Sequence, residues 1–407
     1  MTYLVCIENA EGRRLDARIA HSAAPAEELR ARYDLDRVRL EVSPRDISEG
    51  PATLWRYAPL LPVADPRRVV SLGEGYTPLL SARRLARKLG LAELALKDEG
   101  RNPSGTFKDR GAAVAVSRYA ELGVKTVAHN SSGNAGGSWS LYASRAGITC
   151  VNLLPADVQA ASLQHCRATG QPTYLTENWH EAGRLIAEAC ERNGWLNICT
   201  LREPYRLEGK KTMGLEIAEQ RGWKMPDAVF YPMGGGLGAI AIWKAFEELL
   251  SLGWVQGKMP RLYVTQYEGC APAVKAFEEG RTECAPWGRI DIPPGGLKSP
   301  NPPGGRAVLK LIREHGGGAI AVATQEALAA IDELAREEGI FACPESATTL
   351  VGLRKAIARG WVAPHERVVL VVTGSGLKSI PTLIQSSSRI VTTSEEILAR
   401  VPAAHNQ

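Results

Sequence analysis

The segment LALKDEGRNPSGTFKDRGAAVAVSRYAEL, residues 94–122, decides the fold class. It opens with an apolar, strand-like run at Leu94–Asp98 and breaks at Asn-Pro and Ser-Gly. It then continues with helical periodicity over Phe107–Leu122. A strand followed by a helix of this length is typical of parallel sheets, because parallel neighbours need long crossover connections. The segment therefore predicts an α/β protein.

The same alternation extends along most of the chain. Further strands are predicted at Thr126–His129, Thr149–Leu154, Ala228–Pro232, Arg261–Gln266, Ala319–Ala323 and Arg367–Val372. Further helices are predicted at Ala135–Ala146, His180–Asn193, Leu237–Leu252, Thr324–Glu338 and Ser346–Arg359. At about 150 residues per domain, 407 residues suggest two or three compact units around a parallel sheet.

The composition excludes several classes of protein. Hydrophobic residues make up 44% of the chain and charged residues 23%, which is ordinary for a globular protein. The net charge of +5 is too dilute for a nucleic-acid partner, and no apolar run is long enough to span a membrane. The start of the chain lacks the pattern of a signal peptide, so a cytoplasmic protein is expected. The eight cysteines form no CxxC pair, and no metal site is predicted.

Lys108 is the strongest candidate for chemistry. It lies at the start of a predicted helix, where the helix dipole disfavours a protonated amine. A lowered amine pKa is what a Schiff-base lysine needs. From this segment alone, the other open interpretation is a surface ion pair of Lys108 with Asp109 or Glu99.

Three further loops follow predicted strands. Asn130–Gly136 opens a helix whose free amides could hold a carboxylate, and Met233–Gly238 has three consecutive glycines that let backbone amides approach a phosphate. Val372–Lys378 ends the last strong strand and offers a hydroxyl from Thr373 or Ser375. Open α/β sheets bind ligands at the carboxyl edge, where these loops would meet Lys108. A lysine, a carboxylate cradle, a phosphate cradle and a hydroxyl together describe a pyridoxal phosphate site for a small amino-acid substrate.

Seven motifs in order carry a family resemblance, which covers about residues 54–378. They are GEGYTPL (73–79), NPSGTFKDR (102–110), SSGNAG (131–136), EPYRLEGKKTMGLEIAEQ (203–220), EGCAP (268–272), PESATTLVGL (344–353) and TGSGLK (373–378). With them the chain resembles the fold-type II family of pyridoxal-phosphate enzymes, and most closely the threonine synthases. The resemblance implies a tryptophan synthase β-like α/β fold of two doubly wound sheets, with the cofactor in the interdomain cleft.

The resemblance also implies roles for individual residues. Lys108 would carry the cofactor as a Schiff base and shuttle protons. The cofactor would be held by Asn134 at its 3′-oxygen, Thr373 at its pyridine nitrogen, and its phosphate by Gly234, Gly235, Gly236, Leu237 and Gly238. The substrate carboxylate would be held by Ser131, Ser132, Gly133, Asn134 and Ala135, and a distal anion by Arg206.

The sequence also predicts the limits of the domains. Residues 1–50 are expected to form an N-terminal extension, 51–111 together with 206–390 a large cofactor-binding domain, 112–205 a smaller domain, and 391–407 a tail with one short helix. The sequence is compatible with a homodimer. Members of the family often carry paired N-terminal cysteines, but only Cys6 is left here, so the resemblance also implies no metal.

Two features that the family often has where the substrate binds are absent from this chain. Thr200 and Leu201 stand where the family often has Asn-Ser, and the glycine loop has Leu237 in place of asparagines that could bind a substrate phosphate. The favoured function is conversion of O-phosphohomoserine to threonine and phosphate by elimination and water addition. The alternatives are β-elimination, as in a serine, threonine or hydroxy-amino-acid dehydratase, and cysteate synthase-like β-replacement. The intact NPSGTFKDR motif argues against a binding protein without catalytic activity.

Overall fold

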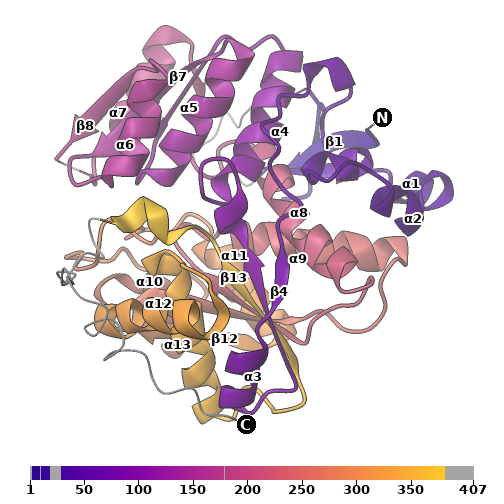
Figure 1. Ribbon diagram of the computed structural model, residues 1–407. Coiled ribbons are helices and arrows are strands. Elements are labelled where there is room, and N and C mark those ends of the chain that lie inside the picture. Colours follow the sequence, from indigo (N-terminus) through magenta and orange to yellow (C-terminus); the bar gives the residue numbers. More distant parts are fainter. Residues whose placement is uncertain (1, 10, 19–28, 178, 381–407) are drawn as a thin grey trace, which may run out of the picture.

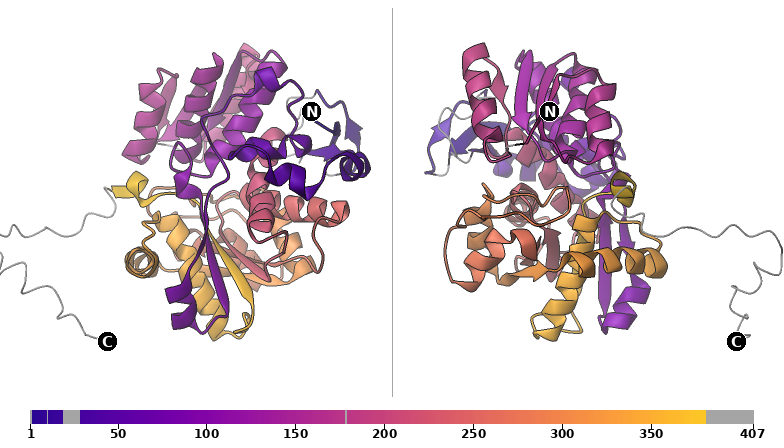
Figure 2. Two further views of the ribbon diagram at one scale, coloured as in Figure 1. Left: turned by 45° about the vertical axis from the view of Figure 1, so that its right-hand side comes forward. Right: turned by 90° about the vertical axis from the view of Figure 1, so that its left-hand side faces the viewer.

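The computed structural model describes residues 2–9, 11–18, 29–177 and 179–380 of the chain (Figure 1). The tail and short helix predicted over 391–407 lie outside the described residues, as do residues 381–390 of the predicted large domain. Two lobes lie one above the other, and a third, smaller layer from the N-terminal residues packs beside them (Figures 1 and 2). The predicted α/β class is confirmed.

The larger lobe contains a six-stranded sheet. Its strands are, in spatial order, β12 (Gly317–Val322), β11 (Arg261–Tyr267), β10 (Ala228–Pro232), β13 (Arg367–Val372), β5 (Glu93–Asp98) and β4 (Leu79–Ser81). All neighbours are parallel except the edge strand β4, which pairs antiparallel with β5. The central strands read as continuous apolar runs because helices cover both faces of the sheet.

The two faces of this sheet are covered by different helices. Val229 of β10 packs in the core that includes α8 (Tyr205–Gln220) and α9 (Leu237–Leu252). Its neighbour Phe230 packs on the opposite face, in the core that includes α12 (Thr324–Glu338) and α13 (Pro344–Ala358). Adjacent residues separate in this way because side chains alternate across a strand. The other helices of this lobe are α3 (Arg83–Leu89), α10 (Pro272–Glu278) and α11 (Gly305–His315).

The smaller lobe is built on a four-stranded parallel sheet. Its strands are, in order, β8 (Thr173–Thr176), β7 (Thr149–Pro155), β6 (Thr126–Asn130) and β9 (Leu196–Asn197). Its helices are α4 (Lys108–Glu121), α5 (Asn134–Ala146), α6 (Ala160–Ala168) and α7 (Ala182–Asn193). All four strands fall within residues 112–205, the range predicted for the smaller domain, whose exact limits stay a prediction.

The N-terminal residues have more structure than the polar composition of residues 1–50 suggests. Strands β1 (Leu4–Asn9), β2 (Arg14–Leu15) and β3 (Leu29–Tyr33) form an antiparallel sheet in the order β2-β1-β3. Two short helices follow, α1 (Leu35–Glu41) and α2 (Pro44–Ser48). The phenol of Tyr33 donates to the buried carboxylate of Glu208 on α8, at 2.9 Å. The N-terminal layer is thereby fastened to the centre of the molecule.

Helix α8 is the centre of the molecule, and every residue from Tyr205 to Glu219 is buried. It packs between α4 and α9 at very short separation. A Cβ at Gly209 would lie 1.9 Å from the carbonyl oxygen of Arg110 on α4, and a Cβ at Gly214 would lie 2.7 Å from that of Ile242 on α9. Only glycine fits at these two contacts. The position of α8 brings the EGKK segment of the sequence to the start of α4.

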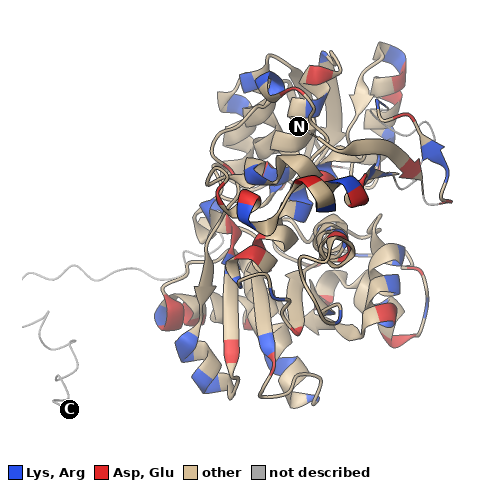
Figure 3. Cartoon of the chain, turned by 90° about the vertical axis from the view of Figure 1, so that its right-hand side faces the viewer, with Lys and Arg blue, Asp and Glu red and all other residues tan. Residues whose placement is uncertain are grey.

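Charged residues of both signs are interspersed over the lobes (Figure 3), in line with the small net charge. Within the described ranges, the helices are all too short or too polar to span a membrane.

Candidate active site

The residues predicted to bind the cofactor meet where the two lobes face each other. Lys108 begins α4 after the loop that follows β5, and Asn134 begins α5 after β6. The glycine loop follows β10, and Thr373 follows β13. One pocket is lined by Phe107, Lys108, Asn134, Thr200, Lys210, Tyr231, Pro232, Gly234, Gly235, Gly236, Leu237, Gly238, Gly296, Leu297, Cys343, Glu345 and Thr373. The four loops therefore converge at the carboxyl edges of both sheets, as expected for open α/β folds.

The side chain of Lys108 has no hydrogen-bond or ion-pair partner among the described residues, and its nitrogen lies 4.3 Å from the centre of the Phe107 ring. The surface ion pair considered from the sequence is absent. Asp109 accepts instead from the Ser138 hydroxyl at 2.5 Å and the Ser104 amide at 2.6 Å. Glu99 pairs with Arg110 at 2.6 Å. Burial, and then the nearby Arg206 guanidinium, lower the pKa of Lys108 to about 7, although Glu345 acts in the opposite direction.

The glycine loop lies tightly against the backbone of Gly296 and the side chain of Tyr231. A Cβ at Gly234 would lie 2.3 Å from the carbonyl oxygen of Gly296, and a Cβ at Gly238 would lie 1.9 Å from the phenol oxygen of Tyr231. Leu237 and Gly238 form the first turn of α9, whose leading amides have no partner within the helix. An anion in this pocket would meet backbone donors that no side chain obstructs.

Thr373 and Asn134 approach the pocket from different lobes. The Thr373 hydroxyl lies 3.1 Å from that of Ser346, and the Thr373 carbonyl accepts from the Phe107 amide at 3.0 Å. The Asn134 side-chain oxygen accepts from the Ser162 hydroxyl at 3.1 Å. Both therefore line the pocket in orientations held by neighbouring side chains.

The other residues predicted to bind substrate are placed differently. Ser131, Ser132, Gly133, Ala135 and Arg206 are not among the described residues that line the pocket. The Ser131 hydroxyl accepts from the amides of Gly133 and Gly136, at 3.1 and 2.9 Å, and so shapes the start of α5. Arg206 is buried, donates to the carbonyl of Ile198 and lies over the Trp139 ring at 5.7 Å. Their roles toward a substrate stay predictions.

Sequence reasoning missed Lys210 and Glu345. Lys210 lies inside the EGKK motif, but its direction could not be known without the helix that carries it. Glu345 is buried, accepts from the Gly296 amide at 2.7 Å with one carboxylate oxygen, and leaves the other without a partner among the described residues. A lysine beside the reactive one and a half-satisfied carboxylate thus belong to the pocket.

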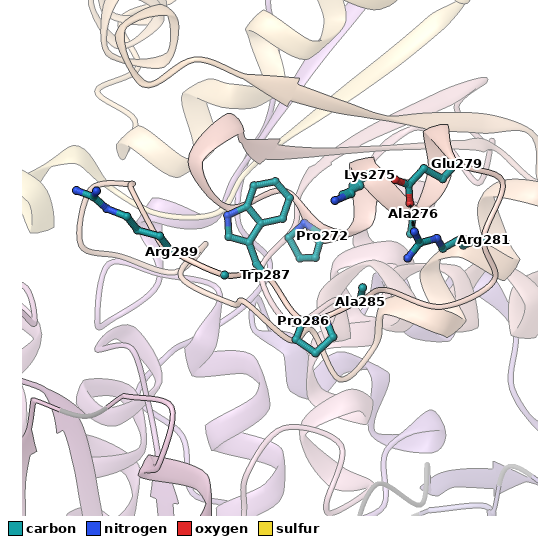
Figure 4. A pocket seen from close by; sticks show the side chains of 10 residues that line it. Pro272, Lys275, Ala276, Glu279, Arg281, Ala285, Pro286, Trp287 and Arg289 are labelled. Atoms are coloured by element: carbon teal, nitrogen blue, oxygen red, sulfur yellow. Dashed lines mark ion pairs between the residues drawn. The ribbon is translucent and has the colours of Figure 1, made fainter.

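A second hollow lies beside α10, away from these residues (Figure 4). It is lined by Pro272, Lys275, Ala276, Glu279, Arg281, Ala285, Pro286, Trp287, Gly288 and Arg289. Arg281 is paired with Glu279 at 2.8 Å. The hollow contains none of the residues predicted from the sequence to act in catalysis. No group of three or more His, Cys, Asp or Glu side chains placed to hold a metal occurs in the described part of the chain.

The fold and the pocket define a class, the two-domain α/β enzymes that hold a cofactor between their lobes. Comparison with known proteins specifies that class further. Residues 70–374 match the family model for pyridoxal-phosphate dependent enzymes. The chain is 35% identical over 87% of its length to the threonine synthase of Methanocaldococcus jannaschii, and 38% identical over 86% to that of Methanosarcina acetivorans, covering 88% and 86% of those proteins. The chain belongs to the pyridoxal-phosphate-dependent enzyme family, and within it is threonine synthase-like.

Solved structures share the fold at lower sequence identity. An L-serine ammonia-lyase from the fungus Rhizomucor miehei matches with a TM-score of 0.63 and 22% identity, over 75% of this chain and 96% of that one. Threonine deaminase isoform 2 from Solanum lycopersicum matches with a TM-score of 0.60 and 20% identity, over 90% of this chain and 100% of that one. The expected fold-type II architecture is confirmed.

The residues present fit pyridoxal phosphate. The unpartnered amine of Lys108 suits the aldehyde of the cofactor, and the glycine loop offers backbone donors to its phosphate. Thr373 offers a neutral hydroxyl, and Asn134 an amide, from the two sides of the cleft.

Replacement of Gly234 with alanine should weaken retention of the cofactor, because the added methyl group would push the Gly296 backbone away from the loop. We expect about a tenfold or greater loss in affinity, the equivalent of one charge-assisted hydrogen bond. Equilibrium dialysis of pyridoxal phosphate measures it. Gly235→Ala is the matched control, since its methyl group would make only ordinary contacts with the side chains of Thr200, at 3.4 Å, and Pro303, at 3.6 Å. Equal losses in both variants would contradict the steric explanation.

The pH at which the cofactor-free protein captures pyridoxal phosphate should report the pKa of Lys108. Only the neutral amine attacks an aldehyde, and a pKa of about 7 makes Lys108 largely neutral above that pH. The capture rate, followed by absorbance, should rise between about pH 6 and 8 and then level off. A rate that keeps rising toward pH 10, as for a lysine with the ordinary pKa of about 10.4, would contradict the burial argument.

Proposed function

We propose that this chain converts O-phosphohomoserine to threonine and inorganic phosphate. The reaction breaks the bond between the γ-carbon and the phosphate oxygen. Water is then added, and its oxygen becomes bonded to the β-carbon. The observation that carries the proposal is the pocket itself, in which an unpartnered lysine amine and a glycine loop line one cavity. The similarity of the chain to threonine synthases supports it. Bound pyridoxal phosphate would supply the electron sink for proton removal next to the amino group.

Lys108 would move the protons. An amine with a pKa of about 7 can accept a proton from the α-carbon of the substrate and return one, since both of its forms are populated near neutral pH. Its freedom from hydrogen bonds leaves the nitrogen available to more than one carbon. The neighbouring Phe107 ring holds the amine without occupying its lone pair.

The other side chains would bind and orient. The amides of Gly234–Gly238 would hold the phosphate of the cofactor, and Thr373, positioned by Ser346, would face its ring nitrogen. A hydroxyl there does not enforce a charged ring as a carboxylate would. The amides at the start of α5, within Ser131–Ala135, would hold the substrate carboxylate, and Asn134 the cofactor's 3′-oxygen. Arg206 would add positive potential for a distal anion.

The test is incubation of the purified yellow protein with O-phosphohomoserine and, separately, with serine and threonine. Release of phosphate together with threonine supports the proposal. A 2-oxo acid from serine or threonine, without phosphate release, would contradict it and favour a dehydratase, in line with Thr200 and Leu237 at positions where the family often has asparagine. No reaction with all three would also contradict it and favour β-replacement. A cytoplasmic location and a homodimer stay predictions.

A further inference from the structure

The buried lysines of this chain differ in how their charge is compensated. Lys97 pairs with Glu216 at 2.6 Å, and Lys211 pairs with Glu208 and Glu248 at 2.7 and 2.8 Å. Lys244 pairs with Glu208 at 3.0 Å. Lys378 donates to the Ser104 carbonyl at 3.1 Å and lies 3.3 Å from His165. Each of these four lysine nitrogens has a polar or charged partner, as expected, because an uncompensated buried ammonium costs several kcal/mol.

Lys210 differs from these four lysines. Lys210 is only 3% exposed, yet its side-chain nitrogen has neither a hydrogen-bond nor an ion-pair partner among the described residues. The face of Phe107 lies 5.2 Å from the nitrogen, measured to the ring centre, and the carboxylate of Glu203 acts on it only from beyond ion-pairing distance. A cation on an aromatic ring gains about 2 kcal/mol when desolvated, which is less than the cost of burial. The positive charge of Lys210 is therefore compensated only when an anion enters the pocket that the side chain lines.

The position of Lys210 indicates which end of the pocket this anion occupies. Its side chain runs over Gly111 of α4, where an added Cβ would lie 3.3 Å from the Lys210 Cε atom. Its nitrogen and that of Lys108 lie over the same Phe107 ring, at 5.2 and 4.3 Å. Burial, and then the nearby Lys108 and Arg206, lower the pKa of Lys210 well below its ordinary value, so an anion would also favour its charged form. The Lys210 amine is thus close to the reactive amine, where substrate atoms must lie.

We propose that Lys210 is the residue that recognises the phosphate group of the substrate, forming its ion pair only when a phosphorylated amino acid is bound. This inference deepens the proposed function and rests on it. Lys210 thus supplies the phosphate contact that the missing asparagines would have made. The sequence had predicted that Arg206 binds the distal anion, but the Arg206 guanidinium already donates to the Ile198 carbonyl. Arg206, four residues earlier on α8, strengthens the positive potential without lining the pocket. Specificity for a phosphate ester thus comes from a side chain on the central helix.

The experiment compares the holoenzyme with Lys210→Gln, which removes the charge, and Lys210→Arg, which keeps it. Lys275→Gln, on the exposed surface of α10, is the matched control. Binding of inorganic phosphate and of homoserine to each holoenzyme is measured by calorimetry, together with KM for O-phosphohomoserine and the cofactor content. Homoserine lacks the phosphate group and reports on the rest of the pocket.

In Lys210→Gln we expect about a 10- to 100-fold loss of phosphate affinity and a similar rise in KM, which is the range for one charged hydrogen bond. Homoserine affinity and cofactor content should stay unchanged, and Lys210→Arg should recover most of the phosphate affinity. Equal losses for phosphate and homoserine would overturn the inference in favour of a structural role. Loss of cofactor would overturn it in favour of a contact with the cofactor's own phosphate, and unchanged phosphate binding would also overturn it.

Failure of the proposed function would look different. If the unaltered protein releases no phosphate from O-phosphohomoserine, but binds inorganic phosphate in a manner that depends on Lys210, the anion site stands and the reaction proposed for it does not.

Discussion

Lys108→Ala is expected to abolish turnover while leaving the fold intact. The variant loses both the amine that attaches the cofactor and the group that moves protons, so we expect at least about a 1000-fold loss of activity. The fold should survive because the Lys108 side chain has no hydrogen-bond or ion-pair partner among the described residues, and its removal leaves no buried group unsatisfied. The absorbance band of the lysine-bound cofactor should disappear.

Two measurements separate this result from simple unfolding. Circular dichroism and the denaturation midpoint of Lys108→Ala should match those of the unaltered protein. Lys275→Gln, with its change on the exposed surface, should keep both its absorbance band and its activity. A folded Lys108→Ala variant with near-normal turnover would show that another residue carries the chemistry.

Glu216→Gln is expected to have the largest effect on stability. Glu216 is fully buried and accepts from Arg110 at 2.5 Å and from Lys97 at 2.6 Å, while Arg110 also pairs with Glu99. The amide would leave two buried cations with one carboxylate. Breaking such a network costs about 3–5 kcal/mol of unfolding free energy. The network ties β5, α4 and α8 together, so cofactor retention should fall as well.

Chemical denaturation followed by circular dichroism and tryptophan fluorescence measures this loss. Glu49→Gln is the control, because Glu49 forms an exposed pair with Arg45 and its replacement should change stability by less than about 1 kcal/mol.

The same network makes stability depend on pH. Burial alone would raise the pKa of Glu216, but the attraction of Arg110 and Lys97 outweighs it and lowers that pKa to about 2. This contribution to stability is present above about pH 4.5 and is lost as the pH falls toward 2. A Glu216→Gln variant as stable as the control would contradict this account.

The structure agrees with the sequence most closely where periodicity is strong. The predicted helix Thr324–Glu338 and the predicted strands Ala228–Pro232 and Arg367–Val372 have the same limits in α12, β10 and β13. Helix α8 was not predicted as a helix, although its motif was quoted, because a helix buried on every side has no polar face to reveal its period. The N-terminal sheet was missed because its strands are short and lie among polar residues, so that no clear period was visible.

By itself, the sequence determined the α/β class, the four loops of the pocket and the identity of Lys108 as the unusual amine. These follow from local rules, since loops after parallel strands must meet at one edge of a sheet. Only the tertiary structure decided that Lys210 faces the pocket while its neighbour Lys211 is compensated by Glu208 and Glu248. Two adjacent lysines look equivalent in a sequence. Their environments differ because α4 and α9 pack against opposite sides of α8, and burial makes the uncompensated one responsive to an anion.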